Sequence, residues 1–272
     1  MAPAPAPGTR SPRMRAALID IDGVLTVSWE PISGAVAAME ELRAAGIPLA
    51  LVTNTTSRSR ASIAGALASA DFPVTASDIL TAPAIAATYL REHYPGARCL
   101  LLNSGDIRAD LTGVTLVDED ARPVDVVLIG GAGPAFSYQA LNRAFGQLQA
   151  GAHLVAMSRG MYWRTSDGLQ LDSGAFVAGL EQAAGTAAEV VGKPAQAFFS
   201  AALKHLGVTA QEALMIGDDI ENDVLAAQRC GLTGVLVKTG KYQARTHSEA
   251  TPAPDHVLGS IADLPRLLNQ PT

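Results

Sequence analysis

The sequence predicts an α/β protein whose parallel-sheet core is interrupted by a second α/β domain. Short apolar runs alternate with segments of helical period near both ends of the 272-residue chain, a pattern typical of parallel strands joined by right-handed crossovers. The middle of the chain repeats this alternation, but it lacks the aspartates that end apolar runs on either side of it. We therefore expect a core formed by residues 14–82 and 186–272, with an inserted domain at 83–185.

Each element of the core follows from an apolar run or from residues typical of helix ends. Strands are predicted at residues 16–20, 47–53, 188–191, 214–216, 235–237 and 256–258, and helices at 33–45, 59–70, 195–206, 223–230 and 262–268. Gly46 is a C-terminal stop for the first helix, and Pro194 opens the helix after Lys193. The inserted domain is predicted to contain strands at 99–102, 124–129 and 153–156 and helices at 138–149 and 174–184.

Composition excludes several classes of function. The formal net charge is −6 and the pI is about 5.3, so we expect no broad basic surface and no nucleic-acid partner. Cys99 and Cys230 stand alone and far apart, which favours reduced structural thiols. The 5 histidines are scattered and form no zinc motif.

The N-terminus is predicted to lie outside the fold. Residues 1–13 are rich in Pro and Ala, and we expect them to form a disordered leader. They lack the apolar centre of a secretory signal peptide. The longest uncharged stretch, residues 126–142, is interrupted by glycines and Pro134, unlike a membrane span. A cytoplasmic protein with no membrane partner is therefore expected.

Two aspartates end the first predicted strand. In ALIDIDGVLT, residues 17–26, an apolar run stops at Asp20 and Asp22 and is followed by Gly23. Asp and Gly are common in turns, so this segment alone could be a capped strand end. The alternative is a metal site or a carboxylate nucleophile.

Three further predicted strands run into polar turns. Thr53 and Asn54 follow the second strand, where they could equally make an ordinary turn. Lys193 follows the strand at 188–191, although a lone lysine is more often a solvated charge. The sequence GDDIEND places four acids within six residues, which repel one another unless they are solvated, cap a helix or surround a cation.

The combination of these turns indicates phosphoryl chemistry. We expect all four at the carboxyl ends of core strands, where open parallel sheets bind their ligands. Carboxylate oxygens suit Mg²⁺, and a hydroxyl, an amide and a fixed positive charge suit a phosphoryl group. The sequence shows no G-x-S-x-G elbow and no phosphate-binding G-x-x-x-x-G-K-[ST] loop, so a carboxylate is the remaining candidate nucleophile.

With these four motifs in order, the chain resembles the haloacid dehalogenase-like (HAD) phosphohydrolases. The large insert between Thr53 and Lys193 resembles the C2-type cap of subclass IIA, which implies a Rossmann-like HAD core. Segments including MYWRTSDGLQLDSGAF, EVVGKPAQAFF and VKTGKY resemble the branch that contains phospholysine phosphohistidine inorganic pyrophosphate phosphatase. Asp22 argues against a dehalogenase, because dehalogenases of this superfamily lack the second Asp, whereas Val24 in place of the common Thr leaves the chemistry intact.

The resemblance implies a role for each motif residue. Asp20 would be the nucleophile and a magnesium ligand, and Asp22 the general acid and then the general base, with its carbonyl also on the metal. Thr53, Asn54 and Lys193 would bind the phosphoryl group. Asp218 would bind magnesium directly, and Asp219 and Asp223 would orient ligands or water. A solvated turn or a helix cap explains Asp219 and Asp223 nearly as well.

The expected function is Mg²⁺-dependent hydrolysis of a small phosphorylated substrate, which could be a phosphomonoester, a phosphoramidate or pyrophosphate. A phosphomutase, or a catalytically silent binding protein on the same fold, is an alternative. The resemblance also suggests a possible homodimer. The cap would select the substrate. The residues that flank a predicted turn or hairpin and could face the cleft are Met161, Tyr162, Trp163, Arg164, Asp172 and Ser173. Tyr162 and Trp163 could instead pack in the core of the cap.

Overall fold

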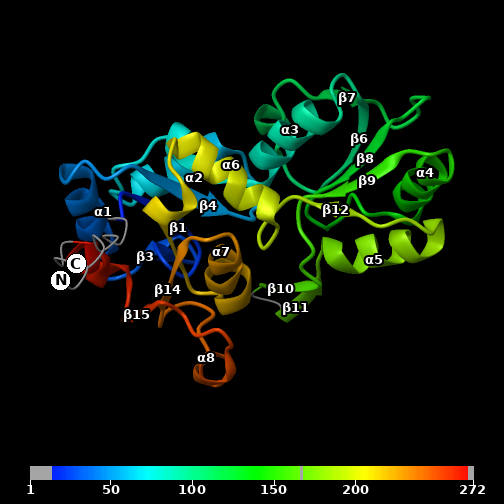
Figure 1. Ribbon diagram of the computed structural model, residues 1–272. Coiled ribbons are helices and arrows are strands. Elements are labelled where there is room, and N and C mark those ends of the chain that lie inside the picture. The colour runs from blue at the N-terminus through cyan, green and yellow to red at the C-terminus, as the bar shows by residue number, and fades with distance from the viewer. Residues whose placement is uncertain (1–13, 166–167, 269–272) are drawn as a thin grey trace, which may run out of the picture.

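The computed structural model describes residues 14–165 and 168–268 and has two lobes, each with its own sheet (Figure 1). The first lobe contains a six-stranded parallel sheet in the order β15-β14-β13-β1-β4-β5. Its strands are β1 (Ala16–Asp20), β4 (Leu49–Thr53), β5 (Ile79–Thr81), β13 (Ala213–Gly217), β14 (Thr233–Val237) and β15 (His256–Leu258). This lobe contains the strands predicted for the core, except the one expected at residues 188–191, and β5 was not predicted.

Helices cover both faces of the core sheet because alternate strand residues point to opposite sides. Ile19, Leu51 and Ile216 pack on one side against helices α1 (Ala35–Ala44), α2 (Arg60–Ser69) and α9 (Leu264–Leu268). Leu18, Val52 and Met215 pack on the other side against α6 (Gln196–Leu206) and α7 (Ala226–Arg229). Both faces of the strands are thus buried, as expected for a parallel sheet.

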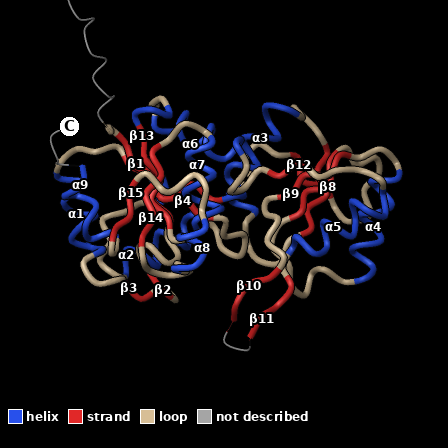
Figure 2. Tube along the Cα trace, turned by 60° about the horizontal axis from the view of Figure 1, so that its bottom comes forward, coloured by secondary structure: helices blue, strands red, loops and turns tan. Residues whose placement is uncertain are grey.

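The second lobe contains a five-stranded parallel sheet in the order β12-β9-β8-β6-β7. Its elements are β6 (Arg98–Leu102), β7 (Thr115–Val117), β8 (Val126–Ile129), α4 (Tyr138–Gln149), β9 (His153–Ala156), α5 (Ser173–Ala184) and β12 (Glu189–Val190). Helices α4 and α5 pack on one face and α3 (Ala82–His93) on the other, as Figure 2 shows. This lobe is the inserted α/β domain that the sequence predicts, and its precise boundaries stay a prediction.

Strand β12 corrects one prediction. The strand expected at residues 188–191 was assigned to the core, but Glu189 pairs with Val155 and Val190 with Ala156 in the second sheet. The sequence identifies an extended segment there, but a run this short carries no pattern that selects one sheet over the other. Lys193 therefore follows a strand of the inserted domain.

Helix α3 joins the two lobes and was also missed. Ile85 packs with Phe198 and Phe199 of the core, whereas Ala86 and Leu90 pack with the second sheet. The run ILTAPAIAATYL joins a strand directly to this helix. The boundary is marked by Thr81, whose hydroxyl accepts a hydrogen bond from the Ala84 N–H, and by Pro83 in the first turn, and these residues are the signal from which the helix could have been predicted.

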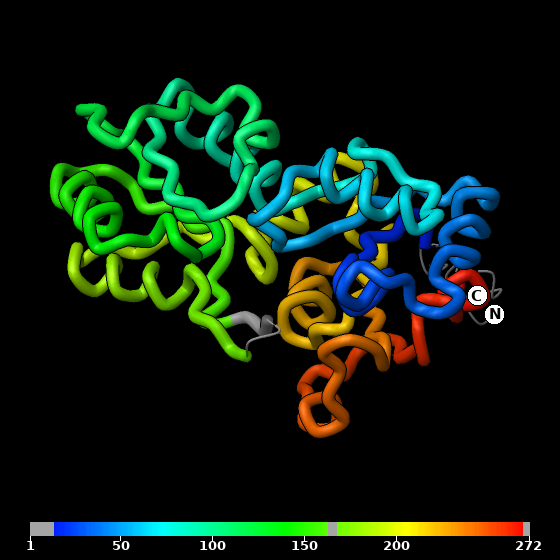
Figure 3. Tube along the Cα trace, turned by 180° about the vertical axis from the view of Figure 1, so that it is seen from behind, coloured from blue at the N-terminus to red at the C-terminus, as the bar shows by residue number. Residues whose placement is uncertain are grey.

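Two hairpins and a short helix are the remaining strands and α-helix of the described residues. The core carries the hairpin β2 (Thr26–Val27) and β3 (Glu30–Pro31), and α8 (Ala244–Glu249) follows β14. The hairpin β10 (Tyr162–Thr165) and β11 (Gly168–Leu171) projects from the second lobe (Figures 2 and 3). Tyr162 is 64% exposed, so it does not pack in the core of the cap, and the side chain of Trp163 lies outside the described residues.

Residues 14–165 and 168–268 contain no helix that is both long and apolar enough to cross a membrane. The predicted leader, residues 1–13, lies outside the described part of the chain.

Candidate active site

Asp20 and Asp22 lie at the carboxyl end of β1, as predicted. The side chain of Asp20 is buried, whereas that of Asp22 is exposed. Gly23 follows with φ +86°, a conformation that residues with a Cβ rarely adopt. A Cβ at Gly23 would lie 1.9 Å from Oδ2 of Asp218, so only glycine allows the two acidic motifs to approach this closely.

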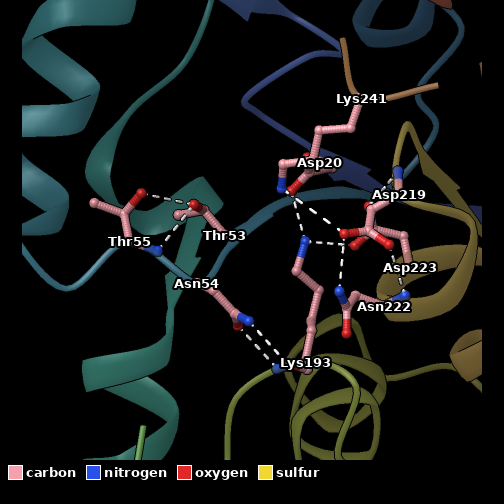
Figure 4. A network of polar contacts seen from close by, with 9 residues as sticks. All are labelled: Asp20, Thr53, Asn54, Thr55, Lys193, Asp219, Asn222, Asp223 and Lys241. Carbon is pink, nitrogen blue, oxygen red and sulfur yellow. Dashed lines mark hydrogen bonds and ion pairs between the residues drawn. The ribbon is translucent and has the colours of Figure 1, made fainter. Parts of the chain in front are cut away.

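Lys193 links the first and last motifs. Its Nζ lies 2.6 Å from Oδ1 of Asp20 and 2.7 Å from Oδ1 of Asp223, and all three side chains are buried (Figure 4). Burial alone would lower the pKa of Lys193, but the two carboxylates raise it overall, so the ammonium stays charged. The single positive charge of Lys193 therefore offsets the two carboxylates of Asp20 and Asp223 only in part.

Asn54 fixes the backbone of Lys193. Its Oδ1 accepts a hydrogen bond from the Lys193 N–H and its Nδ2 donates one to the Lys193 carbonyl, each at 2.8 Å (Figure 4). Gly192 packs closely here, because a Cβ would lie 2.0 Å from the Met157 carbonyl oxygen. The end of core strand β4 therefore holds the loop that returns from the inserted domain.

Thr53 ends β4 with a buried hydroxyl. Its Oγ1 lies 2.9 Å from Oγ1 of Thr55 and accepts a hydrogen bond from the Thr55 N–H at 3.1 Å. Since β4 pairs directly with β1, Val52 stands opposite Asp20, and Thr53 follows at the same edge of the sheet.

Asp218 and Asp223 complete a buried acidic cluster after β13. One ligand oxygen from each of Asp20, Asp218 and Asp223 can lie within 4.8 Å of the others. Burial raises the pKa of Asp20 to about 6, that of Asp218 to about 6 and that of Asp223 to about 7. Three buried carboxylates this close together require positive charge nearby to offset their repulsion. The ammonium of Lys193 supplies only part of that positive charge.

The donor set fits a hard divalent cation. Oδ2 of Asp218 accepts a hydrogen bond from the Lys241 N–H at 2.6 Å, whereas its buried Oδ1 has no hydrogen-bond partner within the described residues. Carboxylate oxygens in this arrangement match the preference of Mg²⁺ for oxygen ligands. Asp20, Asp218 and Asp223 thus form a group that could hold a divalent metal ion.

Asp219 and Asp223 differ in their surroundings. Asp219 caps the π-helix Ile220–Leu225, because its Oδ1 accepts from the Asn222 N–H at 3.1 Å. Asp223 lies inside that π-helix, with a side chain 2% exposed. The predicted helix over 223–230 is thus a π-helix running into α7, a feature often found at functional sites.

The segment VKTGKY adds contacts that the sequence did not assign. Gly240 packs beside Gly23 against the same oxygen of Asp218, since a Cβ at Gly240 would lie 1.9 Å from Oδ2 and 2.5 Å from the Cα of Gly23. Thr239 donates its hydroxyl proton to the Gly23 carbonyl, and Lys241 Nζ lies 3.8 Å from Oδ2 of Asp219. A glycine between Thr239 and Lys241, directly after a buried strand, is the signal that could have indicated a close approach.

Three comparisons place this geometry among known proteins. Residues 17–116 match the family described as haloacid dehalogenase-like hydrolase, and residues 190–264 match HAD-hydrolase-like proteins. Human phospholysine phosphohistidine inorganic pyrophosphate phosphatase is 36% identical over 269 residues, which cover 97% of each chain. The rat haloacid dehalogenase-like hydrolase domain-containing protein 2 is 39% identical over 241 residues, covering 89% of this chain and 90% of the relative.

Solved structures agree with the sequence relatives. The p-nitrophenyl phosphatase from Archaeoglobus fulgidus superposes with a TM-score of 0.87 at 26% identity, covering 94% of this chain and 100% of the other. NagD from Escherichia coli K-12 gives a TM-score of 0.84 at 25% identity, covering 92% and 98%. These matches confirm the predicted fold, and with the phosphatases among the relatives they identify the chain as a phosphatase. The chain belongs to the haloacid dehalogenase-like hydrolase family.

Proposed function

We propose that the chain is a Mg²⁺-dependent phosphatase that hydrolyses a small phosphorylated substrate through an aspartyl-phosphate on Asp20. The observation that carries this proposal is the buried position of Asp20 beside Lys193 and Asp218. The substrate class covers phosphomonoesters, phosphoramidates and pyrophosphate. The relative named for phospholysine, phosphohistidine and pyrophosphate supports the inclusion of the last two.

Asp20 acts as the nucleophile. One of its oxygens is paired with Lys193 Nζ at 2.6 Å, which fixes the carboxylate and leaves the other oxygen to attack phosphorus. The phosphorus–leaving-group bond breaks as the Asp20–phosphorus bond forms. Water then attacks phosphorus, which releases inorganic phosphate and restores Asp20.

Asp22 moves the protons. Asp22 lies two residues after Asp20, where the chain bends, and its side chain is exposed. Loss of water contact to the surrounding protein raises the pKa of its carboxyl group above the ordinary value, although the positive charges of Lys241 and Lys193 lower it. A carboxyl group with a raised pKa can hold a proton for the leaving oxygen. After that step, the carboxylate takes a proton from the attacking water.

Thr53, Asn54 and Lys193 hold the phosphoryl group. The Lys193 ammonium neutralises its charge, and the Thr53 hydroxyl donates to one of its oxygens. Because both polar atoms of the Asn54 amide are bonded to Lys193, Asn54 contributes by positioning Lys193 and through its own main-chain N–H.

Asp20, the carbonyl of Asp22 and Asp218 are the proposed Mg²⁺ ligands. When bound, Mg²⁺ would offset the negative charge that gathers between the nucleophile and the substrate phosphate. Asp223 holds Lys193 against Asp20, and Asp219 fixes the turn that carries Asp218. A cytoplasmic location and a homodimer stay predictions.

The decisive experiment compares the wild-type chain with Asp20→Asn, using p-nitrophenyl phosphate and Mg²⁺. We expect the variant to lose phosphate release by at least 1,000-fold, roughly the cost of removing a covalent nucleophile. Beryllium fluoride with Mg²⁺ should raise the melting temperature of the wild type but not that of Asp20→Asn. Unchanged turnover in Asp20→Asn would refute the aspartyl-phosphate.

A further inference from the structure

A guanidinium–ring contact joins two loops that leave the candidate active site. The β2–β3 hairpin follows Asp22 along the chain, and the other loop runs from Thr53 to the start of α2. Figure 2 shows this hairpin at the edge of the core lobe near α2. At its turn, the ring centre of Trp29 lies 4.7 Å from the guanidinium carbon of Arg58. This distance is within the range of a cation–π interaction.

The turn that carries Trp29 has an unusual backbone. Ser28 has φ 52° and Trp29 has φ 69°, so two consecutive residues with a Cβ occupy the left-handed region that hairpin turns usually fill with Asn and Gly. The Trp29 ring is half-buried and packs against the apolar cluster under the core sheet. The ring is therefore a fixed surface, and Arg58 rests on it.

Arg58 has its charge free for a ligand. Its side chain is exposed, and no carboxylate in residues 14–165 or 168–268 pairs with it. Arg60, two residues further on, is instead held by Asp110, with Nε 3.1 Å from Oδ1. The contact with Trp29 ties the guanidinium to the hairpin that follows Asp22 along the chain, and the guanidinium retains donors for a planar anion.

We propose that Arg58, held by Trp29, is a specificity-determining residue that binds an anionic group on the leaving part of the substrate. The inference rests on the proposed function, because a leaving oxygen protonated by Asp22 must lie beside Asp22, and Trp29 ties Arg58 to the hairpin that follows Asp22 along the chain. The favoured substrates are phosphate compounds with a carboxylate or a second phosphate close to the bond that breaks. Arg58 binds this group and takes no part in bond breaking.

Two phosphate esters that differ by one carboxylate test this proposal. The full chain with Mg²⁺ is assayed on phosphoglycolate and on ethyl phosphate, and we expect the wild type to prefer phosphoglycolate. Arg58→Ala should lower kcat/KM for phosphoglycolate by about 10- to 100-fold, mainly through KM, and change that for ethyl phosphate less than about 3-fold. Arg58→Lys should restore part of the preference. Trp29→Leu keeps apolar packing but removes the aromatic ring, and it should reduce the preference for phosphoglycolate over ethyl phosphate by about 2- to 5-fold.

Equal losses on the two esters, or no loss on either, would overturn the role of Arg58. Calorimetric binding of both esters to the Asp20→Asn protein, with and without Arg58→Ala, separates this inference from the proposed catalytic mechanism. A preference for phosphoglycolate that disappears with Arg58→Ala supports the inference whether or not turnover is seen. Equal binding of the two esters by the protein that retains Arg58 contradicts it.

Discussion

The side-chain amide of Asn54 makes two hydrogen bonds to the backbone of Lys193, each 2.8 Å long. Asn54 follows strand β4 of the core sheet, whereas Lys193 follows strand β12 of the second sheet. Lys193 is therefore fixed to the core by these two hydrogen bonds, although the chain enters the candidate site from the second lobe. The same pair makes the position of Lys193 sensitive to how the two lobes meet.

Asn54→Ala should lower kcat by about 10- to 100-fold, because Lys193 loses the two bonds that place its Nζ against Asp20. KM should change less, since the ammonium remains. Steady-state kinetics on p-nitrophenyl phosphate would measure both, with Asn142→Ala as a control, because Asn142 is exposed on α4. A change confined to KM would instead mean that the Asn54 amide binds the substrate directly.

Gly23→Ala should abolish activity, whereas Gly46→Ala should leave it unchanged. Both glycines have positive φ, +86° and +67°, so the backbone strain of the new residue is similar in the two variants. Only at Gly23 would the added Cβ meet a neighbour, Oδ2 of Asp218 at 1.9 Å, while nothing lies within 4 Å at Gly46. The stability lost at Gly46 should be about 1–2 kcal/mol by urea unfolding, with more lost at Gly23. Similar activity in the two variants would show that the contact with Asp218 is unimportant.

The acidic motifs could be predicted from the sequence because each depends on local order. An apolar run followed by Asp20 and Asp22 predicts a strand end, and parallel strands place their carboxyl ends together. Asp218 follows from the same rule applied to β13. These residues meet as expected, with Asp20 and Asp218 in one cluster.

The sheet to which the strand before Lys193 belongs could not be predicted in the same way. Its strand has two residues, and pairing with β9 rather than with the core depends on contacts between segments far apart in sequence. The pairing of Asn54 with Lys193 depends on those contacts too. The sequence therefore predicts which side chains lie in the candidate site. It does not predict which lobe carries each of them, or that the Asn54 amide is hydrogen-bonded to Lys193.

Asp218→Asn should stabilise the metal-free protein at pH 7 but not at pH 4. Burial raises the pKa of Asp218 to about 6 from an ordinary 3.8, so between these values the folded protein holds a proton that the unfolded chain has released. The contribution of Asp218 to stability consequently falls as pH rises through this window. Urea unfolding in EDTA should show the variant gaining up to about 3 kcal/mol over the wild type by pH 7. If the difference in unfolding free energy between Asp218→Asn and the wild type stays constant with pH, the raised pKa of Asp218 is contradicted.

Mg²⁺ should raise the melting temperature of the wild type at pH 7.5 and leave that of Asp218→Asn nearly unchanged. An ion that binds only the folded state adds about 2.7 kcal/mol of stability at 100 times its Kd. The unpartnered Oδ1 of Asp218 is the group that the ion would satisfy, and the asparagine variant lacks its charge. Asp106→Asn, which alters an exposed acid in the second lobe, should respond to Mg²⁺ like the wild type. If Asp218→Asn is stabilised as much as the wild type, the ion binds elsewhere, and the acidic cluster would then be held by Lys193 alone.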